Sequence, residues 1–154
     1  MSYPLIKQFV LTKDGKTYVF RVFDDHTGCK PPWEEEDGHG PVRHLYAHYG
    51  IKGLKHPGER VLHQDGRNYW LYNWQGAARL ARTEWGAKDI NEAVQADFDY
   101  LKSFLQGDWH YVGVGYVEVE ADGTFPEENG PYYRNAVWGF ESTSDFHEIA
   151  NELV

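Results

Sequence analysis

Residues 5–23 read LIKQFVLTKDGKTYVFRVF, two apolar runs on either side of Asp14-Gly15. An Asp-Gly pair between apolar runs favours a two-residue hairpin turn, because both central positions of a type I′ turn need positive φ. Alternate apolar residues of the second run share one face of the expected strand: Tyr18, Phe20 and Val22. Arg21 lies on the opposite face. This stretch therefore predicts an antiparallel hairpin at the start of the fold.

A second Asp-Gly pair, Asp65-Gly66, joins Arg60–His63 to Tyr69–Tyr72 and predicts a shorter hairpin. Large aromatic side chains are concentrated in its second strand and just beyond it: Tyr69, Trp70, Tyr72 and Trp74. Such side chains stack on nucleic-acid bases where a basic surface surrounds them. The sequence shows no surrounding basic surface, so we interpret the alternation as strand and core packing.

The third pair, Asp122-Gly123, follows a long strand expected at Tyr111–Glu120. Glycines at alternate positions of this strand predict a close backbone approach or a bulge. We expect its partner strand at Ala136–Glu141. The connection between them, residues 125–134, is rich in Gly and Pro, and we expect a long irregular loop there.

Helical periodicity predicts three helices. The first spans residues 74–85, and the second begins after Asp89, which has an N-capping side chain, and ends at Gly107. Ser144 begins the last one. Acidic residues on the second helix are expected on its solvated surface: Glu92, Asp97 and Asp99.

Strands and helices that occur in separate runs predict an α+β fold, with an antiparallel sheet built from hairpins and about three helices packed on it. We find no internal repeat and no linker, so we expect a single α+β domain over residues 1–154. A chain of this length with 16% aromatic residues can bury a substantial core, which argues against disorder.

Composition narrows the classes of function. The one cysteine, Cys29, allows no intrachain disulfide, as in proteins of the reducing cytoplasm. No apolar stretch approaches the roughly 20 residues that cross a bilayer, and the N-terminus lacks the features of a secretion signal. The formal charge of −9 opposes non-specific binding to nucleic acid or anionic lipid. We therefore expect neither direct nucleic-acid binding nor membrane binding; the acids either confer solubility or face a basic protein.

Residues 24–58 lack a strand or helix period over much of their length, which is unusual in a compact domain. His26 and Cys29, followed by His44 and His48, are spaced like a degenerate zinc motif, and the last two share a face if that piece is helical. The alternative is a set of loop histidines, some hydrogen-bonded to carboxylates. The prolines and acids between the two pairs favour that alternative, and we assign neither a metal ligand nor a cofactor.

The segment Pro31–Val42 is the first candidate site. Asp37 and His39 with flanking glycines are compatible with acid–base chemistry, although Asp37 also suits a turn at Gly38. Trp33 beside two prolines, followed by acids, is typical of an interface anchor, unless the indole covers the core instead. We expect binding rather than catalysis, through these residues: Trp33, Glu34, Glu35, Glu36, Asp37 and His39.

Several short stretches, in the same order along the chain, resemble small proteins encoded by tailed bacteriophages and prophages. They include Pro32-Trp33, Asp37–Val42, and Asp108-Trp109 with Tyr111–Val114. The resemblance implies a phage-encoded accessory protein that acts in the cytoplasm of the bacterial host. It implies no catalytic residue.

Together these features predict a protein that binds a host or phage protein. The specific version is an inhibitor of a bacterial defence system, of the anti-CRISPR or anti-restriction kind, whose partner is a nucleic-acid-binding effector. The sequence leaves open a second class, a small enzyme, with or without a metal ion, that uses the loop of Asp37 and His39. It also does not determine the oligomeric state.

Overall fold

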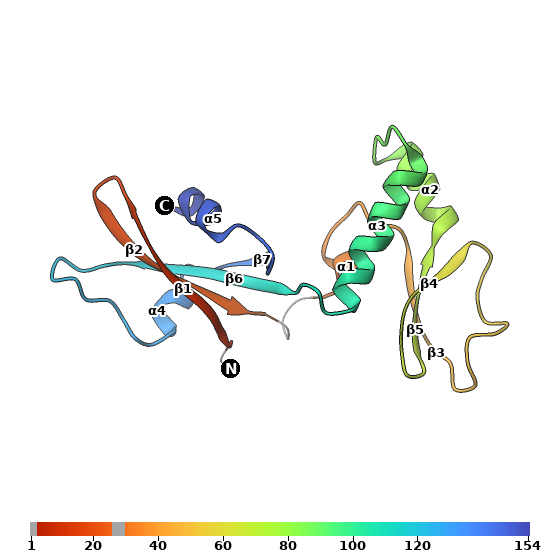
Figure 1. Cartoon of the computed structure of the whole chain (residues 1–154), viewed down its shortest axis with the longest axis horizontal. Coiled ribbons are helices and arrows are strands. Elements are labelled where there is room, and N and C mark those ends of the chain that lie inside the picture. The colour runs from red at the N-terminus through yellow and green to blue at the C-terminus, as the bar shows by residue number, and fades with distance from the viewer. Residues whose placement is uncertain (1–2, 26–29) are drawn as a thin grey trace. The chain divides into compact units, whose positions relative to one another are not determined.

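The computed structural model describes residues 3–25 and 30–154 (Figure 1). Within these ranges the chain forms seven strands, all in antiparallel pairs, and five helices, which confirms the predicted α+β class. We expected one sheet in one domain, whereas the contacts divide the chain into two compact units. The terminal unit consists of Met1–Cys29 with Trp109–Val154, and the central unit is Lys30–Asp108. Each unit has its own sheet.

The terminal unit contains a four-stranded sheet in the order β1-β2-β6-β7. Its elements are β1 (Leu5–Lys13), β2 (Lys16–Asp24), β6 (Tyr111–Glu118), α4 (Gly130–Tyr133), β7 (Val137–Glu141) and α5 (Phe146–Leu153). Positive φ at both Asp14 and Gly15 confirms the predicted hairpin turn. The pairing of β6 with β7 was also predicted, whereas the single helical turn α4 lies in a connection expected to be irregular.

Both faces of this sheet are covered, by α5 on one side and α4 on the other (Figure 1). Phe20 and Val22 pack toward α5, as the alternation predicts. Arg21 faces α4 and is buried, with hydrogen bonds to Gln8, to Asn129 and to the carbonyl of Glu127. These bonds compensate for the loss of water around the guanidinium.

The central unit contains a three-stranded sheet in the order β3-β5-β4. Its elements are α1 (Pro32–Glu35), β3 (Val42–Tyr46), β4 (Glu59–Asp65), β5 (Asn68–Asn73), α2 (Trp74–Thr83) and α3 (Ile90–Leu105). The predicted helix cap is present, since the Asp89 side chain accepts a hydrogen bond from the backbone N–H of Glu92.

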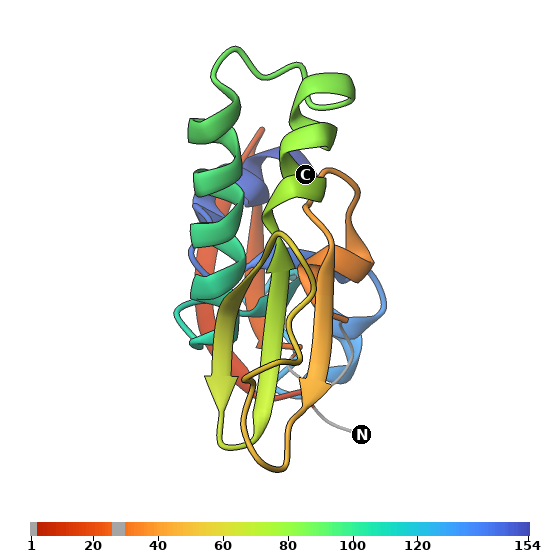
Figure 2. The same ribbon diagram turned by 90° about the vertical axis from the view of Figure 1, so that its right-hand side faces the viewer.

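The two faces of the central sheet are covered differently. On one face Leu62 and Tyr72 pack in a core with α2 and α3. On the other face Tyr69 and Leu71 pack with Ala47, and the segment 47–58 crosses this side of the sheet (Figure 2). In the described parts of the chain, no helix is long and apolar enough to span a bilayer.

Candidate functional site

The candidate loop begins with a single helical turn, α1, rather than irregular structure. Two consecutive prolines start it, because proline at the first helical positions loses no hydrogen bond and has a suitable φ. The carbonyl of Pro31 accepts hydrogen bonds from the backbone N–H groups of Glu34 and Glu35. The Glu35 carboxylate in turn accepts one from the backbone N–H of Lys30. This first part of the loop is therefore locally ordered.

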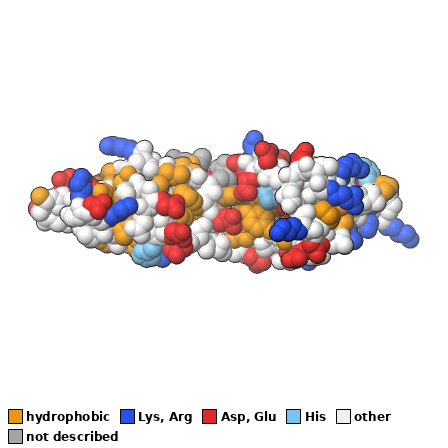
Figure 3. All heavy atoms as spheres, turned by 90° about the horizontal axis from the view of Figure 1, so that it is seen from above, with side chains coloured by type: hydrophobic (Ala, Val, Ile, Leu, Met, Phe, Trp, Pro, Cys, Tyr) orange, Lys and Arg blue, Asp and Glu red, His pale blue; other side chains and the backbone are white. Residues whose placement is uncertain are grey.

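Trp33 is half-buried and packs against the core formed with α2 and α3. Of the two interpretations of this indole, the structure favours a side chain that covers the core. The acids that follow it are exposed: Glu34, Glu35, Glu36 and Asp37. Acidic side chains lie together on this part of the central unit in the space-filling view (Figure 3). The accessible chemistry of the loop is consequently carboxylate rather than indole.

His39 does not point freely into solvent; its side chain is only 11% exposed. Its Nδ1 lies 2.6 Å from Asp97 Oδ1 and its Nε2 lies 3.2 Å from Glu36 Oε2. The imidazole also stacks on the ring of Tyr100, with a centroid distance of 5.6 Å. Both ring nitrogens face carboxylates, so the doubly protonated imidazolium can donate to both.

Asp97 is the centre of this network. The carboxylate is 8% exposed, and its Oδ2 accepts hydrogen bonds from the Gly40 backbone N–H at 2.8 Å and from the Tyr72 hydroxyl at 2.7 Å. A side chain at position 40 would not fit, because a Cβ there would lie 2.6 Å from the Tyr72 ring. Asp97 therefore holds the end of the loop against α3 and β5.

The expectation that Asp97 lies on the solvated surface of its helix is wrong. Asp97 follows Val94 by three residues and precedes Leu101 by four, so it belongs to the stripe that faces the core. That spacing was visible in the sequence. Its partners were not, since His39 is 58 residues away along the chain. Asp37, which the sequence placed beside His39, is exposed, and the buried partner is Asp97 instead.

The network shifts two pKa values. The hydrogen bond to Asp97 raises the pKa of His39 above 6.5; burial opposes this shift, and Glu36 adds to it. Burial raises the pKa of the Tyr72 hydroxyl far above its usual range, with a further contribution from Asp97. The site therefore favours a charged imidazole and a neutral phenol.

The degenerate zinc motif finds little support. His44 lies on β3 rather than on a helix, and its Nε2 is 2.9 Å from Asn68 Oδ1, while His48 contacts Arg67. His26 and Cys29 lie outside the described residues. Within the ranges described, no three His, Cys, Asp or Glu side chains are grouped so that they could hold a metal ion.

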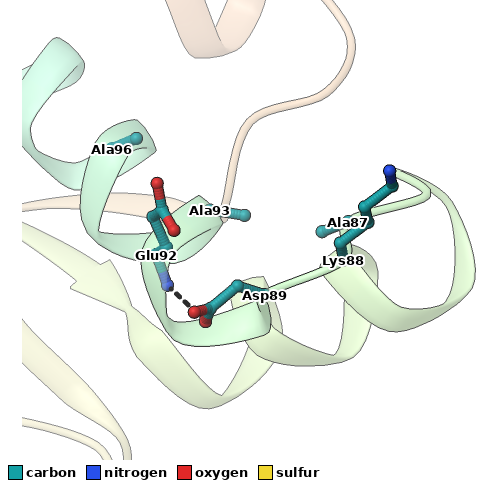
Figure 4. Close-up of a pocket in the computed structure, with 6 residues that line it drawn as sticks. All are labelled: Ala87, Lys88, Asp89, Glu92, Ala93 and Ala96. Carbon is teal, nitrogen blue, oxygen red and sulfur yellow. Dashed lines mark hydrogen bonds between the residues drawn. The ribbon is translucent and has the colours of Figure 1, made fainter.

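A pocket of about 350 Å³ lies elsewhere in the central unit, where α2 is followed by α3 (Figure 4). It is lined by Ala87, Lys88, Asp89, Glu92, Ala93 and Ala96. One of its three charged side chains, Asp89, already caps α3. The pocket contains none of the predicted binding residues.

The comparisons with known proteins found no protein-family model, no curated protein and no solved structure that matches the chain.

Proposed function

We propose that this chain is a phage-encoded accessory protein that acts by binding a host or phage protein. Specifically, it inhibits a bacterial defence nuclease, of the CRISPR or restriction type, by occupying a basic nucleic-acid channel. The observation that supports this best is the loop itself. Four exposed acids, Glu34–Asp37, stand on a segment whose far end is held by the buried Asp97.

The hydrogen bonds from the loop to Asp97 matter for binding, because a preordered loop loses less conformational entropy when a partner binds it. Carboxylates that are exposed before binding also attract a basic surface over distance, which raises the association rate and makes it sensitive to salt. His39 and Asp97 serve this function indirectly, by holding the loop. The contact with the partner is made by the acids.

The experiment uses bacterial strains that carry defined restriction or CRISPR systems and express either the wild-type chain or a variant with reversed charges. The variant is Glu34→Lys with Asp37→Lys, two exposed positions. We expect the wild type to restore phage plaquing against at least one system and the variant to lose most of that effect. The matched control is Asp122→Lys with Glu128→Lys, an equal charge change at exposed positions of the terminal unit.

The purified effector that responds then allows a direct test. Binding to the immobilised effector should slow at least about tenfold in association rate for the loop variant, and much less for the control variant. Equal loss in both variants would show a general charge effect, and the loop proposal would fail. Failure to inhibit any system in the panel would count against the defence-inhibitor function as a whole.

A second candidate function, a small enzyme, is favoured by one specific observation. A buried carboxylate that orients an imidazole at Nδ1 is found in general-base pairs; here Nε2 lies 3.2 Å from Glu36, so it could take up a proton from a substrate only after leaving that partner. In that case Asp97, and not Asp37, is the residue that positions His39. A hydrolase substrate screen decides: activity that His39→Gln abolishes and Asp37→Asn leaves intact would favour the enzyme. Metal analysis of the purified protein tests its metal-assisted version.

A further inference from the structure

The charges of the central unit are divided along its sequence. Residues 38–83, which include the whole sheet and α2, contain seven Lys or Arg and only two Asp or Glu. The rest of the 154-residue chain contains eight Lys or Arg and twenty-two Asp or Glu. On the face drawn in Figure 3, blue side chains gather at one end of the central unit, and red and blue ones both lie on the rest of it. Residues 38–83 are therefore basic, although the net charge of the whole chain is −9.

One of the two local acids is already neutralised. Glu59 forms two hydrogen bonds with the guanidinium of Arg43, at 2.7 and 3.0 Å, and its side chain is buried. Arg43 lowers the pKa of Glu59, so this carboxylate stays ionised and paired. Asp65, at the end of β4, is the other acid. The exposed cations Arg60, which pairs with Tyr72 across the sheet, and Arg67, in the turn after β4, outnumber it.

A row of planar side chains crosses the sheet in this basic region. His44 on β3 and His63 on β4 both pair with Trp70 on β5, so the three side chains lie side by side on one face. The ring centroids of His44 and His63 are 4.8 and 5.6 Å from that of Trp70. This is the face that α2 and α3 cover near Tyr72, but His44 is exposed and Trp70 only half-buried.

The row continues past the end of β3. Tyr46 lies two residues after His44 on the same face and is 57% exposed. Its ring is followed by those of His48, at 6.4 Å, and Tyr49, which is 97% exposed. We call the six side chains the aromatic row: His63, Trp70, His44, Tyr46, His48 and Tyr49. Arg67 contacts this row through His48, with 3.1 Å between nitrogens.

Core packing explains only part of the row. Tyr69 and Tyr72 of the same strand are buried, as the sequence predicted, but Tyr49 contributes almost no buried surface. A ring that stays exposed gains no burial energy on folding, so it contributes little to stability. The combination of exposed rings and an excess of cations matches a ligand that is both planar and anionic.

We propose that the aromatic row binds single-stranded nucleic acid. Bases stack on the rings, which needs no particular sequence because every base has a π-face. Phosphates lie near Arg67, whose guanidinium contacts the row through His48. Duplex nucleic acid keeps its bases stacked on one another, so it cannot use the rings. An acidic peptide could use the cations but would leave the rings without partners.

This proposal differs from the expectation, based on the net charge of the whole chain, that the protein does not bind nucleic acid directly. Salt screens charges over about 8–10 Å, so a phosphate at this face responds mainly to nearby cations and not to acids farther away. The proposal does not depend on the acidic loop, and either surface can be tested without the other.

The test measures fluorescence anisotropy of labelled dT and U oligonucleotides with the full-length protein at about 50 mM salt. We expect binding that weakens as salt rises. Tyr46→Ala and Tyr49→Ala should each weaken it at least about fivefold, the equivalent of one lost stacking contact. Arg67→Gln should weaken it and flatten the salt dependence. Because Tyr49 is almost fully exposed, its replacement leaves the fold intact.

Matched controls lie in the terminal unit. Phe125→Ala removes a partly exposed ring and Lys16→Gln removes an exposed cation, and both should bind like the wild type. No binding to either oligonucleotide would overturn the proposal. So would binding that survives Tyr46→Ala combined with Tyr49→Ala, or equal binding of duplex DNA or polyglutamate. If polyglutamate binds equally well, the cations alone would explain the binding, without any stacking on the rings.

Discussion

Asp97 accepts hydrogen bonds from three groups: the imidazole of His39 and the backbone N–H of Gly40 in the loop, and the hydroxyl of Tyr72 on β5. One buried carboxylate thereby satisfies three donors, two of them at the end of the acidic loop. A buried donor that loses its acceptor costs about 1–3 kcal/mol. The position of the loop's end thus depends on one side chain of α3, Asp97.

The first prediction follows from that dependence. Asp97→Ala should lower the free energy of unfolding by at least about 3 kcal/mol, because three donors lose their acceptor. Asp99→Ala, on the same helix at an exposed position, should change it by less than about 0.5 kcal/mol. Urea unfolding followed by tryptophan fluorescence measures both. Equal effects would show that Asp97 does not hold the loop.

The second prediction concerns pH. The pKa of His39 is raised in the folded state, so the stability that its charge contributes is fully present below about pH 6.5 and is lost as the pH rises through the raised value. The groups that face it are Glu36, Asp97 and Tyr100. The difference in urea stability between wild type and His39→Gln should therefore be larger at pH 5.5 than at pH 9.

An NMR titration provides an independent check of the same prediction. The imidazole resonances of His39 should report a pKa above 6.5 in the wild type. In Glu36→Gln that value should fall part of the way, because Glu36 is a smaller cause than Asp97. A stability difference that grows with pH, or a pKa below 6.5, would contradict the proposed charge pairing.

At the scale of elements, local signals account for most of the observed helices and strands. Asp89 illustrates how: its carboxylate accepts from the N–H of Glu92 at 3.1 Å and so satisfies one of the free donors at the start of α3. By contrast, β3 was missed in a segment expected to be irregular. Its five residues, VRHLY, show no regular alternation of apolar and polar side chains, so only pairing with β5 reveals the strand.

The third prediction tests the cap. Asp89→Ala should destabilise the chain by about 1 kcal/mol, because the donor of Glu92 loses its side-chain acceptor. Asn91→Ala, an exposed position in the first turn, is the control and should be neutral or slightly stabilising, since Ala favours helix. Thermal unfolding by circular dichroism distinguishes them. If the two variants melt alike, the cap contributes nothing measurable.

At the scale of the whole molecule, the central unit is one uninterrupted stretch, Lys30–Asp108, with its own core. The terminal unit is built from both ends of the chain. Charge follows the same division. The terminal unit contains five Lys or Arg and twelve Asp or Glu. The central unit contains ten Lys or Arg and twelve Asp or Glu. Most of the net acidity therefore belongs to the unit that does not contain the acidic loop.

The fourth prediction follows from this division. A fragment of residues 30–108 should fold without the rest of the chain, because its core cluster is drawn from its own residues. Cooperative urea unfolding and retention of the His39 titration would confirm it. At roughly 80 residues the fragment should be only marginally stable. A fragment that gives the circular dichroism of an unfolded chain would show that the central unit needs the terminal one.

The sequence by itself determined the three Asp-Gly hairpins or turns, the α+β class and the three long helices, because turn chemistry and helical period act over a few neighbouring residues. It also determined which residues are acidic and aromatic. Only the tertiary structure decided that the chain makes two sheets, that Asp97 pairs with His39, and that His44, Trp70 and His63 form one row. Those outcomes depend on strand pairing and packing between residues far apart in sequence, and no local pattern specifies them.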